Sequence, residues 1–416
     1  MFKRFCLLLF LLHLPLLSFS QTLELSGQNL RIGGGIHLDY LFFEPKETSF
    51  DYPGGKRDND FLLKRARVKL WFSQSHAEEF IQFGLEPALE KPVLDAELDL
   101  LLKPGLRLRF GQFKPPFSEE RLESDLASDF IEKSLASNLS LSRSLGVSLK
   151  YFDQTTGICW EGGIFSGEDK WKNSTDSHPE IETRLSRSWV GENFTLKLGA
   201  SYAWGKRLNQ SFTPKSFKGK TTNEFVFFSP VEVNGIRERW EGDFKLYFRS
   251  FSVFGEYIHS WEERKKVNID VDIDSDGVSD QQIVCHRSPL KEQGWTAGFT
   301  WLVTGEKKAK RVIPKSKWGA LELVFRGHSI EFDGSSEGIA LPGLVSTGNE
   351  VNKTSQLLSR KSIDEKLVAY TLGMNWYLAP GLVLEADGIW QNFDQSFIRN
   401  GHHSDFNARI RISYWF

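Results

Sequence analysis

The last ten residues of the chain, Asn407 to Phe416, read NARIRISYWF and alternate between two kinds of side chain. The even-numbered positions from Ala408 onward are apolar, whereas Arg409 and Arg411 lie on the other face. Strict alternation over ten residues predicts a β-strand with one apolar face. An apolar face that ends in aromatic residues, opposite a face that carries arginine, is typical of a strand between lipid and a water-filled lumen.

The composition of the whole chain fits a membrane β-barrel. The mean hydropathy is −0.34 and 25% of the residues are charged, yet 13% are aromatic, with 34 Phe and 13 Trp. Only alternate residues of a barrel strand face lipid, so the average hydropathy of a barrel resembles that of a soluble protein. Beyond the N-terminus no apolar run reaches the about 18 residues of a transmembrane helix. The net charge of −2 argues against a general nucleic-acid-binding protein.

The N-terminus predicts secretion. Two basic residues precede an apolar run from Leu7 to Leu17, and Ser18 and Ser20 supply the small side chains that a signal peptidase reads. This pattern is typical of a secretory signal peptide, here residues 1–20. We therefore expect a single β-barrel domain over residues 21–416, located in the outer membrane of the cell.

The two-residue period repeats along the chain and predicts an antiparallel barrel of about 16 strands. The expected strands cover residues 30–44, 61–73, 78–86, 93–102, 106–114, 144–153, 157–165, 181–189, 194–204, 235–248, 251–264, 293–303, 317–329, 366–378, 381–393 and 407–416. Short connections alternate with long ones, as periplasmic turns and outer loops do in such barrels. Two connections break the alternation, because 87–92 is a short outer loop and 304–316 is a long, Lys-rich periplasmic one. A further short strand is expected in the outer loop at 225–229.

One region is more specific than the alternation. Residues 62–70 read LLKRARVKL, residues 111–117 read GQFKPPF after a Pro-Gly turn, and residues 132–147 contain EKSLAS and RSLGV. In these motifs the chain resembles the phosphate-selective porin O and P family. The resemblance implies a homotrimeric porin of 16 strands whose third outer loop, here Lys114 to Arg143, folds into the pore. Helix-like spacing of apolar residues within 119–135 predicts a short helix that would narrow it.

Alternation assigns the basic residues of several strands to the lumen, because Arg or Lys facing lipid costs up to about 2–4 kcal/mol at mid-membrane. Together with cations of the third loop, the candidate pore-lining and selectivity residues are Arg65, Arg67, Lys69, Arg107, Arg109, Lys114, Arg121, Lys133, Arg143, Arg237, Arg239, Arg409 and Arg411. Fixed positive charge along a pore wall concentrates anions. These rows predict a preference for small anionic solutes, and the resemblance implies phosphate.

Acidic residues leave a second interpretation open. Asp95, Glu97 and Asp99 share one face of a strand between two basic strands, and the third loop is itself rich in acidic residues. In this interpretation the basic rows form ion pairs within the wall and the pore has little anion preference. A phosphate filter needs several cationic donors that converge at the narrowest point, and the loop shows no such surplus.

A separate motif, DIDSDGVSD from Asp272 to Asp280, matches the first part of a calcium-binding loop. The ligands would be Asp272, Asp274, Asp276, the carbonyl of Val278, and Asp280. Ile283 stands at the twelfth position, where a bidentate acid is expected. The motif predicts a structural calcium ion in an outer loop, and the alternative is a solvated acidic loop. The sequence points to no cofactor that the function requires.

Three functions are compatible with such a barrel. The one we expect is an outer-membrane porin for passive diffusion of small hydrophilic solutes, with lipid, the solute and further copies of the chain as its partners. The second is a barrel with a blocked lumen that acts as an adhesin, a receptor or a structural protein. The third is an outer-membrane hydrolase built on His259 and Ser260 or on His328 and Ser329. No third catalytic group is identifiable, so we expect no enzyme.

Overall fold

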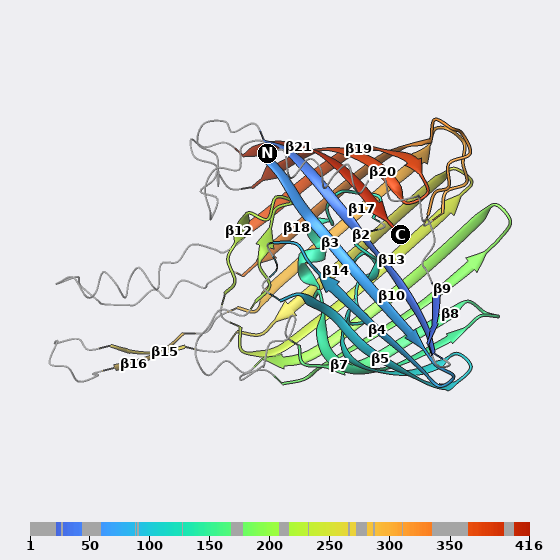
Figure 1. Cartoon of the computed structure of the whole chain (residues 1–416). Coiled ribbons are helices and arrows are strands. Elements are labelled where there is room, and N and C mark those ends of the chain that lie inside the picture. The colour runs from blue at the N-terminus through green and yellow to red at the C-terminus, as the bar shows by residue number, and fades with distance from the viewer. Residues whose placement is uncertain are drawn as a thin grey trace.

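The fold was analysed in a computed structural model that describes residues 22–25, 28–43, 60–87, 89, 91–126, 128–167, 178–207, 216–231, 233–264, 267–271, 281–285, 288–309, 311–334, 365–394 and 403–416. The expected signal peptide and the aspartate-rich motif lie outside these residues. Sixteen antiparallel strands form a closed barrel (Figure 1). No helix in the described ranges is long and apolar enough to cross a membrane.

Each barrel strand pairs with its neighbours along the chain, and the first pairs with the last, which closes the sheet. The strands are β2 (Gln28–Phe43), β3 (Asp60–Ser73), β4 (Ala77–Gly84), β5 (Val93–Lys103), β6 (Leu106–Phe113), β7 (Ser144–Asp153), β8 (Ile158–Phe165), β9 (Glu180–Val190), β10 (Phe194–Arg207), β13 (Gly235–Phe248), β14 (Phe251–Glu262), β17 (Leu290–Leu302), β18 (Ala320–Asp333), β19 (Glu365–Ala379), β20 (Leu382–Phe393) and β21 (Ser404–Trp415). All sixteen overlap the expected ranges, so the predicted 16-stranded antiparallel barrel is confirmed.

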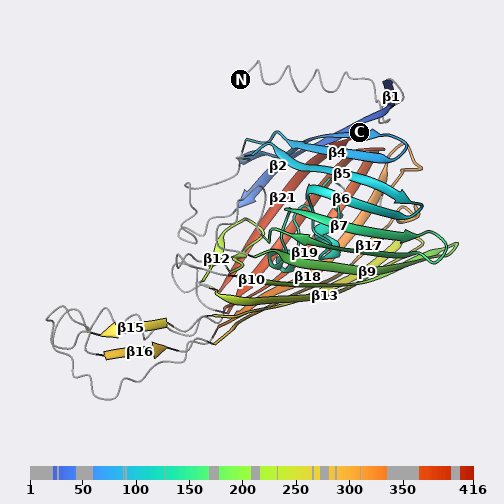
Figure 2. The same ribbon diagram turned by 90° about the horizontal axis from the view of Figure 1, so that it is seen from below.

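Five short strands of the described chain lie outside the barrel wall or between its strands. The first, β1 (Thr22–Leu25), pairs with β2 and extends the sheet. The other four form two hairpins, one of β11 (Gly219–Lys220) with β12 (Val226–Phe228) and one of β15 (Val267–Val271) with β16 (Gln281–Cys285). Figure 2 shows β15 and β16 beyond one end of the barrel. The short strand expected at 225–229 is β12.

The two faces of the wall follow the two-residue period of a strand. In β13, Arg239 and Glu241 are buried, whereas Trp240 and Phe244 are exposed. The same alternation of buried and exposed residues continues through β9, β10, β19 and β21. The inner face is therefore charged and the outer face is apolar and aromatic, as expected for a barrel surrounded by lipid.

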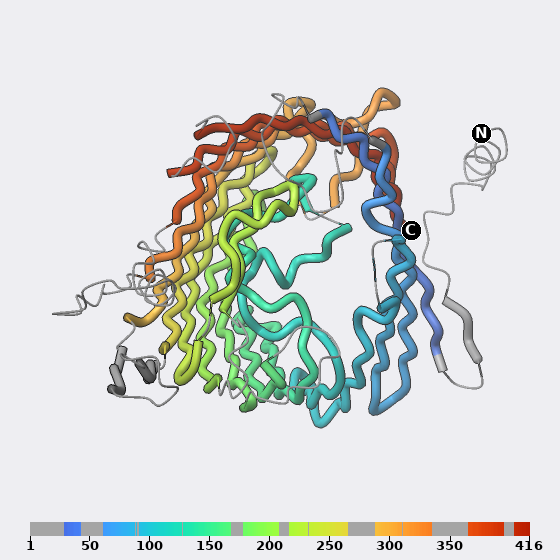
Figure 3. The backbone as a smooth tube through the Cα atoms, turned by 90° about the vertical axis from the view of Figure 1, so that its left-hand side faces the viewer, coloured from blue at the N-terminus to red at the C-terminus, as the bar shows by residue number. Residues whose placement is uncertain are grey.

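An apolar cluster joins two long connections to one side of the inner wall. Leu135 and Leu139, from the 3-10 helix η1 (Leu135–Leu139), belong to the same buried cluster as Phe228 of β12. The ring of Phe228 stacks on that of Phe332 in β18, with centroids 3.9 Å apart. Figure 3 shows these teal and yellow-green segments against the ring of strands. Residues 216–233 therefore pack with residues 114–143, a contact that the sequence patterns did not predict.

Candidate functional site

Basic residues on β6 are paired with acidic residues on β5. The Nε and Nη2 atoms of Arg109 donate to the carboxylate of Asp99 at 2.6 and 2.8 Å, and its Nη1 lies 3.4 Å from Glu97. Arg107 pairs with Glu78 and lies 3.7 Å from Asp99. Asp99 and Arg109 are partners in the strand register. These basic residues are thus partly neutralised by their neighbours in the wall.

The three basic residues predicted on β3 share one face but have different partners. Arg65 lies 3.9 Å from Asp125, and Arg67 is ion-paired with Glu86. The Nζ atom of Lys69 donates to the hydroxyl of Ser124 at 3.3 Å. Two of the three therefore contact the connection between β6 and β7.

The predicted arginines of β13 and β21 are buried in ion pairs. Arg237 pairs with Glu262, and Arg239 pairs with Glu180 and lies 3.4 Å from Glu182. On β21, two arginines face acidic residues, Arg409 pairing with Glu132 and Arg411 bonding Asp39 at 2.6 and 2.8 Å. Their positive charge is compensated within the protein.

The predicted cations of residues 114–143 divide into two kinds. Arg143 bonds Asp95 at 2.9 and 3.0 Å, and Lys133 lies 3.4 Å from Asp125. By contrast, Lys114 donates to the backbone carbonyls of Arg121 and Glu123 at 2.8 and 2.6 Å, and Arg121 donates to carbonyls in and beside η1. Burial lowers the pKa of Lys114 to about 7.

Three predicted cations have no carboxylate within ion-pairing distance in the described part of the chain: Lys69, Lys114 and Arg121. All the other predicted residues are ion-paired. The ion pairs therefore support the interpretation in which most basic residues are paired within the protein. The anion preference stays a prediction.

Acidic residues of the 114–143 connection contact cations on several sides of the barrel. Glu119 bonds Arg184 of β9 at 2.9 Å and Lys197 of β10 at 2.6 Å. Glu132 lies 3.1 Å from Lys64. Burial would raise the pKa of both carboxyl groups, but the surrounding cations lower it overall. The acidic residues therefore stay ionised, and their charge is compensated by the cations they contact.

Backbone contacts add to these ion pairs. The amide of Ile131 donates to Asp387 of β20 at 3.0 Å, and the amide of Leu135 donates to Nδ1 of His328 in β18 at 3.0 Å. The amide of Glu120 donates to Glu256 of β14 at 2.9 Å. The connection is thus bonded to strands from several parts of the wall.

Several cations in this network were not predicted from the sequence. A bulge pairs His37 with Arg65 but Leu38 with Leu63, so Lys64 is an extra residue that strict alternation cannot assign. Lys308, in the long connection 304–316, lies 2.6 Å from both Asp129 and Glu322. Lys308 lies in an irregular connection, so the two-residue period of the strands could not predict its position. Arg184 and Arg326 lie on the inner faces of regular strands and could have been found by extending the alternation to β9 and β18.

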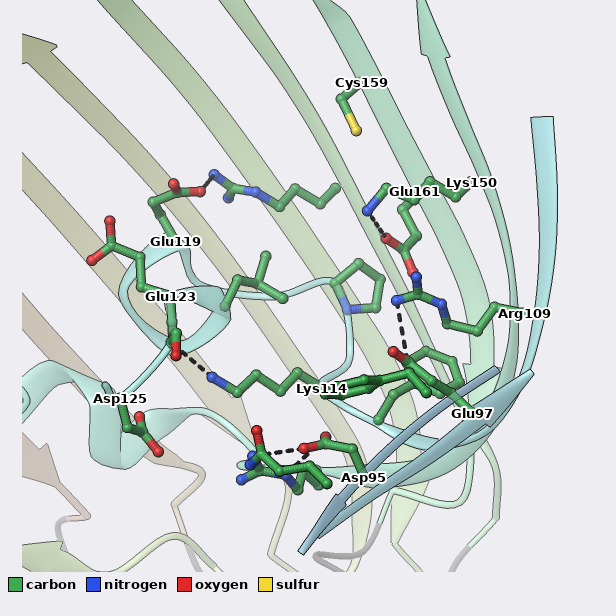
Figure 4. Close-up of a pocket in the computed structure, with 18 of the residues that line it drawn as sticks. Asp95, Glu97, Arg109, Lys114, Glu119, Glu123, Asp125, Lys150, Cys159 and Glu161 are labelled. Carbon is green, nitrogen blue, oxygen red and sulfur yellow. Dashed lines mark hydrogen bonds and ion pairs between the residues drawn. The ribbon is translucent and has the colours of Figure 1, made fainter. Parts of the chain in front are cut away.

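An open cavity of about 420 Å³ lies between residues 114–126 and strands β3 to β10. Eight basic and six acidic side chains line it, including Lys69 and Lys114. Figure 4 shows the Lys114 side chain extending to Glu123, whose carbonyl oxygen accepts a hydrogen bond from its ammonium group. On the other side of the connection, beside β13 to β18, a cavity measures only about 50 Å³. The connection is thus packed toward one side of the barrel, with the open space on the other.

The open space continues toward the short turns. A cavity of about 530 Å³ shares Phe80, Glu97 and Arg109 with the first, and another of about 710 Å³ shares Arg109 and Lys150. The 710 Å³ cavity reaches the turn between β5 and β6. All three cavities have Arg109 in their lining, so they adjoin one another along one side of the barrel.

The histidines considered for hydrolysis do not form serine pairs. Ser260 is fully buried, whereas His259 lies on the other face of β14 beside the ring of Trp240. His328 accepts the Leu135 amide, while the Ser329 hydroxyl donates to a backbone carbonyl. Adjacent residues of a strand point to opposite faces, which explains both separations. The predicted calcium-binding loop lies outside the described residues and stays a prediction.

Comparison with known proteins gives one family. The family model described as phosphate-selective porin O and P matches residues 60–415, which is most of the chain. A search of curated protein sequences finds no significant match.

Several solved structures share the fold at low sequence identity. OmpT of Vibrio cholerae in its trimer form has a TM-score of 0.55 at 11% identity, covering 94% of this chain and 100% of that one. An anion-selective porin from Comamonas acidovorans has a TM-score of 0.54 at 11% identity, with coverage of 94% and 100%. The outer membrane channel DcaP of Acinetobacter baumannii has a TM-score of 0.54 at 10% identity, with coverage of 96% and 100%.

Proposed function

Since the chain belongs to the phosphate-selective porin O and P family and is an outer-membrane porin, we propose that its pore passes small hydrophilic solutes with a modest preference for anions. The observation that carries this proposal is the pair Lys69 and Lys114, which line the open cavity without a carboxylate partner among the described residues. Unneutralised cations in a narrow wall raise the local concentration of anions.

Residues 114–143 are proposed to be the inward-folded third loop that narrows this pore. Supporting the proposal, the segment bonds to β9, β14, β18 and β20, and it lines the cavity on one side. A solute would then pass between this loop and strands β3 to β10.

A dedicated phosphate site is a weaker candidate. Tight recognition of phosphate needs several free donors around one point, whereas Arg67, Arg109 and Arg143 already bond carboxylates. A weak, general anion preference needs only a small excess of positive charge. The eight basic and six acidic residues of the cavity give an excess of that kind.

The test is the reversal potential of the refolded protein in a planar bilayer under a KCl gradient. We expect an anion-selective sign in the native protein and a shift toward cation selectivity in the double variant Lys69→Met and Lys114→Met. Lys206→Met is the matched control, because Lys206 is exposed on the outer face of β10. A cation-selective native protein would refute the preference. The absence of any current would favour the blocked barrel that acts as an adhesin or receptor.

We also propose that the porin is a homotrimer, which agrees with the trimer form of OmpT from Vibrio cholerae. Native mass spectrometry of the detergent-solubilised protein tests this directly. A single species with the mass of one chain would refute it.

A further inference from the structure

A second cavity with unpaired cations lies at the end of the barrel where the short turns are. It measures about 450 Å³ and is lined by Arg31, Trp71, Arg311, Ile313 and Trp415, together with the turn between β19 and β20. Its lining is largely aromatic and aliphatic, with two arginines as the charged residues. This composition differs from the mainly charged cavity beside residues 114–126.

Neither arginine forms an ion pair within the part of the chain that the structure describes. The guanidinium of Arg31 lies over the ring of Trp71, 4.3 Å from its centroid, and Arg311 is exposed. Neither has a carboxylate within 4.0 Å among the described residues, in contrast to most cations of the inner wall. Exposed guanidinium groups without partners are available to an anionic ligand.

The connection between β17 and β18 fixes the chain on both sides of Arg311. Lys308 is almost fully buried between Asp129 and Glu322, at 2.6 Å from each. Val312 is buried in an apolar cluster with Leu302 and Tyr377, against which Trp415 packs. These anchors flank Arg311, which lines the cavity together with Arg31.

The cavity adjoins the proposed route of permeation. It shares Arg31 and Trp71 with the 530 Å³ cavity, which in turn shares Phe80 and Arg109 with the cavity beside residues 114–126. A solute that has crossed the narrow part of the pore therefore meets this site before it reaches the end of the barrel.

We propose that this site binds organic monoanions that carry a carboxylate on an aromatic ring. The proposal rests on the proposed function, because the ligand reaches the site through the pore. Arg31 and Arg311 would hold the carboxylate by charge-assisted hydrogen bonds, and the indole and aliphatic side chains would cover the ring. An inorganic anion lacks the apolar part that this lining favours.

The experiment measures the reduction of KCl current through the native porin on titration with benzoate, acetate and inorganic phosphate. We expect benzoate to act at a clearly lower concentration than acetate or phosphate. Arg31→Gln and Arg311→Gln should each weaken its apparent affinity about tenfold. Lys317→Gln removes an exposed charge from the same connection and should leave the affinity unchanged.

Two results would overturn the proposal: benzoate no more effective than acetate, or equal benzoate affinity in the native protein and in both arginine variants. Each variant's current without additives shows that it has folded and conducts. A native protein that conducts KCl but ignores benzoate refutes only this site, whereas a native protein without any current refutes the porin function itself.

Discussion

Replacement of Lys308 by methionine should loosen residues 114–143, the segment proposed to narrow the pore. The ammonium group lies 2.6 Å from Asp129, in the 114–143 connection, and 2.6 Å from Glu322, in the wall. Its side chain is 1% exposed. Burial alone would lower the pKa of Lys308, but the two carboxylates raise it overall. The lysine is therefore a charged bridge between the loop and the barrel, and methionine retains most of its volume without its charge.

The magnitude follows from the burial of this bridge. Removing one partner of a buried ion pair costs about 3–5 kcal/mol, because it leaves an uncompensated charge. Even about 3 kcal/mol changes the ratio of docked to undocked loop by about a factor of 100. We expect higher and noisier single-channel conductance and a lower temperature of unfolding. Lys307→Met is the control, since Lys307 is exposed and donates to a backbone carbonyl.

The pH dependence of the protein's stability follows from the lowered pKa of Asp129. Burial would raise the pKa of Asp129, but Lys308 and other cations lower it below 3.8. The ionised carboxylate therefore stabilises the folded native protein at neutral pH, and this contribution is lost only as the pH falls through the lowered pKa. In the Lys308→Met variant the contribution is lost at neutral pH as well. Adding Asp129→Asn to that variant should restore part of the stability. Native-like conductance and stability of Lys308→Met at neutral pH would refute the bridge.

Three further outcomes are expected. Because burial lowers the pKa of Lys114 to about 7, the anion preference should fall as the pH rises through about 7, a dependence that Lys114→Met abolishes. The unfolded chain binds more protons at this group, so its contribution to stability should rise with pH above that value. Glu132→Gln removes the partner of several cations and should increase anion selectivity in reversal-potential measurements. Gly111→Ala places a Cβ 2.1 Å from the carbonyl oxygen of Ala96 at φ 125° and should prevent folding into a heat-resistant barrel, whereas Gly242→Ala, with nothing within 4 Å, should be tolerated.

The fold was predictable because its determinants are local. A strand between lipid and water must alternate, and the cost of a charge in lipid fixes which face is inside. Arg409, Arg237 and Arg109 were therefore assigned to the inner face from their immediate neighbours alone. The confirmed strands extend by at most a few residues beyond the expected ranges, where the alternation fades into the turns.

The site was less predictable because its contacts join distant segments. Alternation put Asp99 and Arg109 on inner faces of adjacent strands, and the pair is formed. It could not reveal that Lys308 reaches Asp129, since an irregular connection has no period that relates it to a loop almost 180 residues away. The packing of Phe228 on Phe332 escaped prediction for the same reason.

The acidic character of the proposed constriction does not by itself favour cations. An ionised carboxylate attracts mobile cations only to the extent that fixed cations leave its charge uncompensated. Glu119, Glu132 and Asp129 are each bonded to wall or turn cations, so their fields cancel at short range. In the function proposed above, the net field acting on a solute depends on the groups left over, chiefly Lys69 and Lys114. On this proposal, ion selectivity is the small difference between two large sets of opposite charge. We therefore expect single substitutions of charged residues at the proposed constriction to change the selectivity in either direction.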